Sequence, residues 1–215
     1  MPSTTLKKKR KPKLTRVEKT ELTRNLLIEG AAEIVGKYGY AEASVSRITE
    51  HAGVAQGTFY NYFETRQDIL DLLPPRYAEK MNQYVGSRMQ PGLTGVDREV
   101  KRLEAFFDYF VETKESARLV NEAPVMAPKG FARFSHIVRE GYIRALERSM
   151  ARGEIEKIDS RKLSDIADFL IALRNGFSQL ILASAMRNKR VPQHFLDSYR
   201  EFVGRALFRD YEDAP

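Results

Sequence analysis

The stretch SVSRITEHAGVAQGTFYNYF, residues 44–63, decides the fold because it contains two short helical segments separated by a glycine. Ser44 is a residue type that begins helices, and the apolar residues after it recur at helical spacing. Gly53 ends this first segment, and two residues separate it from Gln56, where the next helix is expected to begin. Two short helices joined by a tight glycine turn predict a helix-turn-helix unit.

The last seven residues of that stretch, GTFYNYF, hold four aromatic side chains and no charge. At about 100° per residue, Phe59 and Phe63 point the same way, so we expect both rings in the core. Tyr60 and Tyr62 can each bury a ring while a hydroxyl remains free to donate. The alternative is a helical hairpin in which both tyrosines are simply core residues.

The rest of the chain also follows helical rather than strand periodicity, which predicts an all-α fold. Thr15 opens a T-x-x-E capping box that begins the first helix, and Gly39 ends that helix. Thr65 is expected to begin a fourth helix through Leu73, which Pro74-Pro75 should break or kink. Later helices are predicted over residues 77–89, 96–113, 115–123, 128–152, 160–187 and 193–208.

The composition limits the class of protein. With 215 residues, of which 42% are hydrophobic, the chain suits one moderate domain or a small domain plus a larger one. It contains no cysteine, which excludes disulfides and thiolate metal sites. Its N-terminal residues lack the apolar run of a signal peptide, and no run of about 18 apolar residues occurs, so we expect a soluble, cytoplasmic protein.

The net charge of +7 is concentrated near the N-terminus. Residues 1–16 contain seven of the 36 basic residues and no acidic one, so residues 17–215 hold 29 basic and 29 acidic residues. Such a block repels itself, and residues 1–14 are therefore expected to form a disordered basic arm. Nucleic acid is the commonest partner of such an arm, because each neutralised phosphate releases a counterion. A solubilising or cloning-derived tail is the alternative.

The pattern GYAEASVSRITEHAGVAQGTFYNYF, residues 39–63, resembles the N-terminal domain of TetR-type (TetR/AcrR) transcriptional regulators. The matching positions are Gly39-Tyr40, Ser44-Val45, Ile48, Ala52-Gly53-Val54, Gly57-Thr58-Phe59-Tyr60 and Tyr62-Phe63. The likeness covers about residues 24–73, and the remainder is similar only in the number and length of its helices. Pro74-Pro75 departs from the family, whose members usually have an unbroken helix there.

The resemblance implies a bacterial, homodimeric and all-helical repressor. Its N-terminal three-helix helix-turn-helix domain would span residues 15–64, and a regulatory domain for ligand binding and dimerisation would span residues 65–215. The dimer would form through the last two helices, about 160–187 and 193–208. Two copies of the reading helix would then recognise a palindromic operator in double-stranded DNA.

The resemblance and the helix geometry together imply that helix 56–62 enters the major groove. The amide of Gln56 suits adenine, Gly57 allows close approach of the backbone, and Tyr62 can donate to a phosphate. Ser44 would contribute to a phosphate site at the start of its helix. The candidate DNA contacts are Lys13, Arg16, Ser44, Arg47, Gln56, Gly57, Thr58, Tyr60, Asn61, Tyr62 and Arg66.

The family also implies a ligand cavity between the C-terminal helices. Residues 166–183, IADFLIALRNGFSQLILA, are apolar apart from Asp168 and a polar centre that includes Arg174 and Asn175. A buried arginine needs an anion, which is either an acidic side chain within the chain or dimer, our favoured reading, or a group on a ligand. The candidate ligand-binding residues are Phe106, Phe110, Met126, Phe134, Tyr142, Arg174, Asn175 and Phe177, although most such rings are ordinary core.

The ring-rich inner positions favour a small hydrophobic or amphipathic effector. Residues 122–146 resemble the corresponding region of family members that sense fatty acyl-CoA or related lipids. The leading hypothesis is therefore a ligand-responsive repressor. The alternative is a DNA-binding structural or nucleoid-associated factor without an effector, which a structure lacking an internal cavity would favour.

Catalysis has little support in the sequence. No nucleophile elbow, zinc-protease motif, P-loop or dinucleotide-binding glycine motif occurs, and His51, His136 and His194 are far apart. We therefore expect no enzyme activity, no cofactor and no metal.

Overall fold

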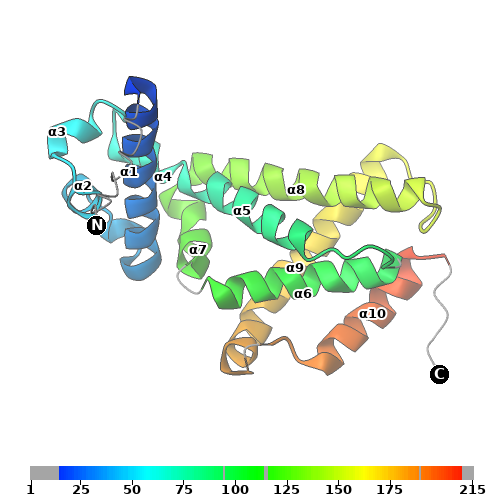
Figure 1. The fold of residues 1–215 in the computed structure, drawn as a ribbon. Helices are drawn as coiled ribbons and strands as arrows, with labels where there is room; N and C mark the ends of the chain where they lie inside the picture. Colours follow the sequence, from blue (N-terminus) through cyan, green and yellow to red (C-terminus); the bar gives the residue numbers. More distant parts are fainter. Residues whose placement is uncertain (1–14, 94, 114–115, 189, 210–215) are drawn as a thin grey trace, which may run out of the picture.

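The computed structural model describes residues 15–93, 95–113, 116–188 and 190–209, and for residues 116 and 178–188 it describes the backbone alone. Within these ranges the regular structure is helical, apart from an isolated antiparallel bridge between Ile155 and Phe208. The predicted all-α fold is therefore confirmed. The N-terminal helices form a small body that packs on one end of a larger helical body (Figure 1).

The helix-turn-helix unit is built largely as the sequence indicates. Its elements are α1 (Arg16–Tyr38), the 3-10 turn η1 (Tyr40–Glu42), α2 (Val45–His51) and α3 (Gln56–Phe59). Thr15 forms the predicted capping box with Glu18, and the Ser44 hydroxyl caps α2 by accepting from the Arg47 N–H. Gly53 between α2 and α3 has a φ of 66°, a conformation that glycine adopts without strain.

The core of this body lies under α3. The rings of Phe59 and Phe63 are both buried, as predicted, with centroids 5.3 Å apart. They pack with Leu27 and Ala31 of α1 and with Ile48 of α2. Because the phenylalanines fix one face of α3 to this core, the opposite face is presented outward.

The reading helix is shorter than predicted. The sequence indicates a helix over residues 56–62, but α3 ends at Phe59 and residues 60–62 form a tight turn. In this turn the N–H groups of Asn61 and Tyr62 donate to carbonyls three residues back, at 3.2 and 2.9 Å. Glycine at position 57 and asparagine at position 61 have low helix propensity, which accounts for the tightening.

The predicted effect of the prolines is also wrong. The chain breaks before them, between α4 (Arg66–Leu70) and α5 (Leu73–Ser87), and Pro74 and Pro75 lie in the first turn of α5. The backbone N–H groups in the first turn of a helix have no acceptor within the helix, so proline, which lacks an N–H group, is tolerated there. The prolines therefore begin a helix rather than interrupt one.

The larger body consists of α5 and five later helices. These are α6 (Gly95–Glu112), α7 (Ser116–Met126), α8 (Pro128–Ala151), α9 (Ser160–Asn188) and α10 (Gln193–Leu207). Helix α5 packs along α8, α6 packs against α9 and α10, and α7 contacts both α1 and α8 (Figure 1). Helix α7 continues through Pro124 to Met126, three residues beyond its predicted end.

No helix in the described ranges has both the length and the apolar character needed to cross a membrane.

Candidate nucleic-acid interface and ligand cavity

The outward face of α3 and its turn is exposed and carries no charge. Gln56, Gly57 and Asn61 are exposed, and the side chain of Tyr60 has 58% of its surface accessible. A Cβ added at Gly57 would meet no described atom within 4 Å, so the backbone there is open to a close partner. Thr58 and Tyr62 are half-buried at the edges of this face, and the Tyr62 ring packs against the core.

The predicted basic and capping residues differ in how far their side chains are already engaged in contacts within the protein. Ser44 uses its hydroxyl to cap α2, accepting from the Arg47 N–H at 3.3 Å. The Arg47 guanidinium lies 4.8 Å from the Tyr38 ring centroid and pairs with Glu42, yet the Arg47 side chain stays 41% exposed. The sequence gives no sign of this contact, because Tyr38 and Arg47 lie on different helices and only the fold brings them together.

Arg66 is held by the protein itself. Its Nε donates to the Ala43 carbonyl at 2.8 Å, and its Nη2 donates to the Tyr40 carbonyl. These bonds fix α4 to the segment that precedes α2, so the guanidinium positions the reading unit instead of facing open solvent. Arg16 is exposed at the start of α1, whereas Lys13 lies outside the described residues.

A cavity of about 540 Å³ lies among α6, α7, α8 and α9. Of the predicted ligand-binding residues, five line it: Phe106, Phe110, Phe134, Arg174 and Asn175. Three do not. The Met126 carbonyl accepts from Gln67 Nε2 at 3.0 Å, the Phe177 ring packs on Phe195 at 5.1 Å, and Tyr142 lines a neighbouring cavity.

Apart from Phe134, the sequence analysis did not reveal the wall that α7 and α8 contribute to this cavity. It includes Val120 and Asn121 from α7 and His136 from α8, together with an ion pair between Arg139 of α8 and Asp168 of α9. That pair is bidentate, with Nε–Oδ1 and Nη2–Oδ2 distances of 2.8 and 2.7 Å. Helical periodicity marks which residues face inward, but it does not say which inward faces leave a gap.

Arg174 is the unusual residue of this site. Its side chain is 5% exposed, and its guanidinium carbon lies 4.0 Å from the Phe106 ring centroid and 5.5 Å from that of Tyr142. Its Nη2 donates over 3.4 Å to the Asn175 amide oxygen, and its Nε is buried without a hydrogen-bond partner. Burial lowers the pKa of the Arg174 guanidinium below its ordinary value.

The salt bridge expected as the first explanation of Arg174 is not found among the described residues of this chain. The nearest candidate, Glu99 of α6, is itself buried, but its carboxylate accepts from Arg102 and, at 2.9 Å, from the Tyr199 hydroxyl. The contact with Phe106 offsets part of the cost of burying Arg174, on the order of 2 kcal/mol for a desolvated cation–π pair. The charge itself is left without an acidic partner.

A second cavity of about 210 Å³ adjoins the first. The two share Phe106, Val138 and Arg174 in their walls. The second cavity is also lined by Arg102, Arg144 and Arg148, and its lining contains no acidic residue. Tyr142, predicted as a ligand-binding residue, lies in this wall.

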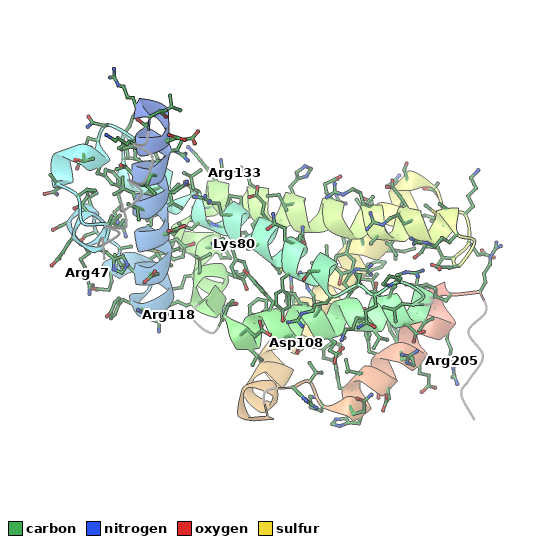
Figure 2. The ribbon with its side chains drawn as sticks, viewed as in Figure 1. Arg47, Lys80, Asp108, Arg118, Arg133 and Arg205 are labelled. Atoms are coloured by element: carbon green, nitrogen blue, oxygen red, sulfur yellow. The ribbon has the colours of Figure 1, made fainter. Side chains whose placement is uncertain are left out.

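Helix α7 is fastened to the N-terminal body by hydrogen bonds at the end of α1. The Tyr40 N–H donates to the Glu122 carboxylate at 3.0 Å, and the buried Tyr40 hydroxyl donates to the Leu119 carbonyl at 3.1 Å. Arg118 Nη1 donates to the Lys37 carbonyl at 2.8 Å, and Figure 2 shows Arg118 where α7 meets the end of α1. Helix α7 therefore joins the wall of the larger cavity to the reading unit.

Helix α8 makes a second connection through Asp71, between α4 and α5. The buried Asp71 carboxylate accepts from the Gly130 N–H at 2.7 Å, and Arg133 Nη2 donates to the Asp71 carbonyl at 2.6 Å. A Cβ at Gly130 would lie 2.4 Å from that carbonyl oxygen, so only glycine allows this approach. Arg133 is labelled at this end of α8 in Figure 2.

Among the described residues, no group of three or more His, Asp or Glu side chains is arranged to hold a metal ion.

Comparison with known proteins agrees with this architecture. The sequence profile of the family described as "Bacterial regulatory proteins, tetR family" matches residues 27–73. The "Fatty acid metabolism regulator protein" of Bacillus subtilis (strain 168) is 42% identical over 59 residues, which cover 27% of this chain but only 29% of that protein's length. The "HTH-type transcriptional repressor DhaR" of Mycobacterium sp. (strain GP1) is 24% identical over 88% of this chain and 94% of its own length.

Two solved structures share the complete fold. A TetR transcriptional regulator from Chloroflexus aurantiacus J-10-FL has a TM-score of 0.66 at 21% identity, covering 88% of this chain and 98% of its own. The transcriptional regulator FadR from Bacillus subtilis, solved in complex with stearoyl-CoA, has a TM-score of 0.63 at 17% identity, covering 83% and 96%. Residues 27–73 thus match the tetR family of bacterial regulatory proteins, and the fold of the whole chain is similar to that of a solved TetR transcriptional regulator.

Proposed function

We propose that this protein is a ligand-responsive repressor that acts in the bacterial cytoplasm. It binds a palindromic operator as a homodimer and is released when a small hydrophobic or amphipathic effector enters the larger cavity. One observation carries the proposal: α7 and α8 wall that cavity, while α7 also binds Tyr40 of the DNA-binding domain and α8 binds Asp71, which directly follows α4.

The DNA-binding surface consists of the exposed face of α3 and its turn, with the start of α2 beside it. Gln56, Tyr60 and Asn61 face outward and reach base edges, while the open backbone at Gly57 permits a close fit. Residues at the edges of this surface, and those before α1, contact phosphates. These phosphate contacts are Lys13, Arg16, Ser44, Arg47, Thr58 and Tyr62, whereas Arg66 positions the reading unit.

Dimer formation uses α9 and α10. Phe169 of α9 is 67% exposed and Phe202 of α10 is 55% exposed, and large exposed apolar side chains commonly mark protein interfaces. Ala172 and Gly176 are also exposed on α9, where their small size permits close helix approach. A two-fold axis through this face sets two copies of α3 about 34–36 Å apart, one turn of DNA.

Effector binding acts through the connections of α7 and α8. A ligand that pushes on the cavity side of α7, at Val120 and Asn121, moves the same helix that anchors Tyr40. The effector weakens operator binding because it favours a conformation in which the two reading helices are wrongly spaced. The difference between the effector's affinities for the two conformations sets how far the population shifts.

The effector is lipid-like. Phe106, Phe110, Phe131 and Phe134 give the larger cavity an aromatic wall that suits an acyl chain. The Bacillus subtilis relatives support this class, since one is named as a fatty acid metabolism regulator and one was solved with stearoyl-CoA. A structural DNA-binding factor, the second candidate, needs no such cavity, so the volume of about 540 Å³ favours the repressor.

The test is a fluorescence anisotropy titration of the full chain against labelled DNA from its own promoter region at physiological salt. The proposal predicts a sequence-specific complex, competed by unlabelled specific DNA and not by random DNA, that dissociates when effector is added. A complex that random DNA competes equally well, or that no lipid-like ligand dissociates, contradicts it. Tyr60→Ala serves as the matched variant, because Tyr60 is exposed and its loss leaves the core intact.

A further inference from the structure

Arg174 lies at the junction of the two cavities with part of its charge unsatisfied. Its Nε is buried and lacks a hydrogen-bond partner, and its side chain is 5% exposed. It lines both cavities, so a molecule in either one can lie against this residue. A buried cation that the protein leaves without an anion is a group prepared to bind one.

The charges around Arg174 reinforce this reading. The smaller cavity is lined by Arg102, Arg144, Arg148 and Arg174, with no acidic residue in its lining. Arg102 is paired with Glu99, and Arg144 with Glu140, but Arg174 lies between the two cavities without such a pair in the described chain. The larger cavity contains one acidic lining residue, Asp168, which Arg139 neutralises. The local potential around Arg174 is therefore positive.

The larger cavity differs sharply in character on its other side. Beyond Arg174 its wall includes Phe106, Phe110, Phe131 and Phe134, with Val120 and Ile171 among them, alongside polar residues such as Asn121, Ser135 and His136. The larger cavity thus has an aromatic wall beside a buried cation, and the smaller, arginine-lined cavity adjoins it at Arg174. This arrangement matches a molecule with an apolar tail and an anionic head.

We propose that the effector is an amphiphile with a compact anionic head group, a carboxylate or a phosphate. The head group lies against Arg174 at the junction, and the tail lies among the phenylalanines of the larger cavity. This inference rests on the proposed function only in taking the cavity as the effector site. It makes Arg174 the residue that selects an anionic amphiphile over a neutral one of the same length.

The first experiment measures binding to the full chain by isothermal titration calorimetry, without DNA. Decanoate is compared with decanol, which has the same tail and no charge. We expect decanoate to bind at least about 10-fold more tightly than decanol, as a charge-assisted pair in a desolvated site requires. Equal affinity for the two, or tighter binding of decanol, overturns the inference.

Arg174→Met and Arg174→Lys test the residue itself. Arg174→Met should weaken decanoate about 10- to 100-fold and leave decanol unchanged, while Arg174→Lys should retain part of the affinity because it keeps the charge. Arg161→Met is the matched control, because Arg161 lies on the same helix, is exposed and lines neither cavity. Loss of decanoate and decanol in parallel means that Arg174 only shapes the cavity, and the inference fails.

A thermal unfolding series guards against a variant that simply misfolds. An unpaired buried cation destabilises the free protein, so Arg174→Met without ligand should raise Tm, and decanoate should no longer raise it further. If Arg174 had a structural partner, its removal would lower Tm instead. Such a drop, together with unchanged stabilisation by decanoate, contradicts the assignment.

Two further ligands identify the source of the anion. Decyl phosphate and decanoyl-CoA carry the charge on a phosphate group, and in decanoyl-CoA the acyl end is a neutral thioester. If either ligand binds Arg174→Met more weakly than the unsubstituted chain, the anion lies at Arg174 and is a phosphate group. Tight decanoyl-CoA binding that the substitution leaves unchanged, with no decanoate binding, overturns the inference.

These outcomes are separable from failure of the proposed function. If decanoate binds through Arg174 but never dissociates the operator complex, the anion site stands and the regulatory role fails. If decanol dissociates the complex as well as decanoate does, the repressor stands and the anion site fails.

Discussion

The two functional regions of this molecule treat charge in opposite ways. The reading face of α3 is exposed and uncharged, offering an amide, a hydroxyl and open backbone at Gln56, Tyr60 and Gly57. The larger cavity is lined in large part by apolar rings and includes one buried guanidinium, Arg174, without an acidic partner among the described residues. The difference follows from the solvent, because a charge in water is screened and weakly selective, whereas a desolvated charge discriminates strongly.

This contrast explains how an uncharged surface serves a polyanionic partner. At the reading face, shape and hydrogen bonds select the sequence, and the coulombic attraction comes from basic residues placed around it. In the cavity, the proposed anion site would use one guanidinium for both attraction and selection. Each region can be tested by altering one member of a closely matched pair of residues.

The largest expected effect comes from the buried side of α3. Phe59→Ala removes a fully buried ring and should lower the free energy of unfolding by about 3–5 kcal/mol, because the cavity left behind refills poorly. Urea denaturation followed by circular dichroism measures this. The adjacent Tyr60→Ala should cost less than about 1 kcal/mol. Similar losses in the two variants would mean that the two faces of α3 are not distinct.

The next largest effect divides base contacts from phosphate contacts. Gln56→Ala should weaken the operator complex by about 1–3 kcal/mol and relax the preference at one base pair. Arg47→Ala should weaken binding to every sequence alike and reduce the dependence of affinity on salt. Anisotropy titrations with single-base operator variants at two salt concentrations read both effects. A uniform loss with Gln56→Ala would remove it from the base contacts.

A smaller effect tests the link between the two regions. Tyr40→Phe removes the buried hydroxyl that donates to the Leu119 carbonyl, at a cost of about 1–2 kcal/mol. We expect the variant to bind the operator yet to need more effector for release, because α7 holds the reading unit less firmly. An unchanged effector response at reduced stability would show that Tyr40 is structural and not part of the coupling.

The smallest effect concerns the ion pair at the larger cavity. Arg139→Gln breaks the exposed pair with Asp168 and should change stability by no more than about 1 kcal/mol. It also leaves the Asp168 carboxylate uncompensated beside the cavity, so decanoate should bind a few-fold more weakly while decanol is unaffected. Calorimetry on the same preparation checks both. Tighter decanoate binding would reverse the proposed sign of the local potential.

The two regions also differ in how well the sequence predicts them. The helix boundaries around Ser44, Gly53 and Thr65 follow from local capping and turn chemistry, which a sequence displays directly. The errors in this region, the early end of α3 and the position of the break near Pro74, are differences of a few residues. Arg66 is predicted to contact DNA because it is a basic residue close to the reading helix. Only the fold shows that its guanidinium donates to two backbone carbonyls of the protein itself.

The cavity was predicted less completely, for a physical reason. Which inward faces leave a void depends on how α6, α7, α8 and α9 pack, and periodicity along one helix does not contain that information. Five predicted residues do line the larger cavity, and Arg174 is the most distinctive of them, because an arginine in an apolar helix needs an anionic partner. Tyr142 instead lines the smaller cavity, and the Phe177 ring packs on Phe195.

The central claim is that a ligand held in the C-terminal cavity controls the reading helices. The most direct measurement titrates decanoate into the operator complex and follows anisotropy, with the original chain and Arg174→Met in parallel. The account predicts release from the original chain and a curve shifted to at least about 10-fold higher decanoate for the variant, at equal starting affinity for DNA. Release curves that coincide, or no release from either protein, would contradict it.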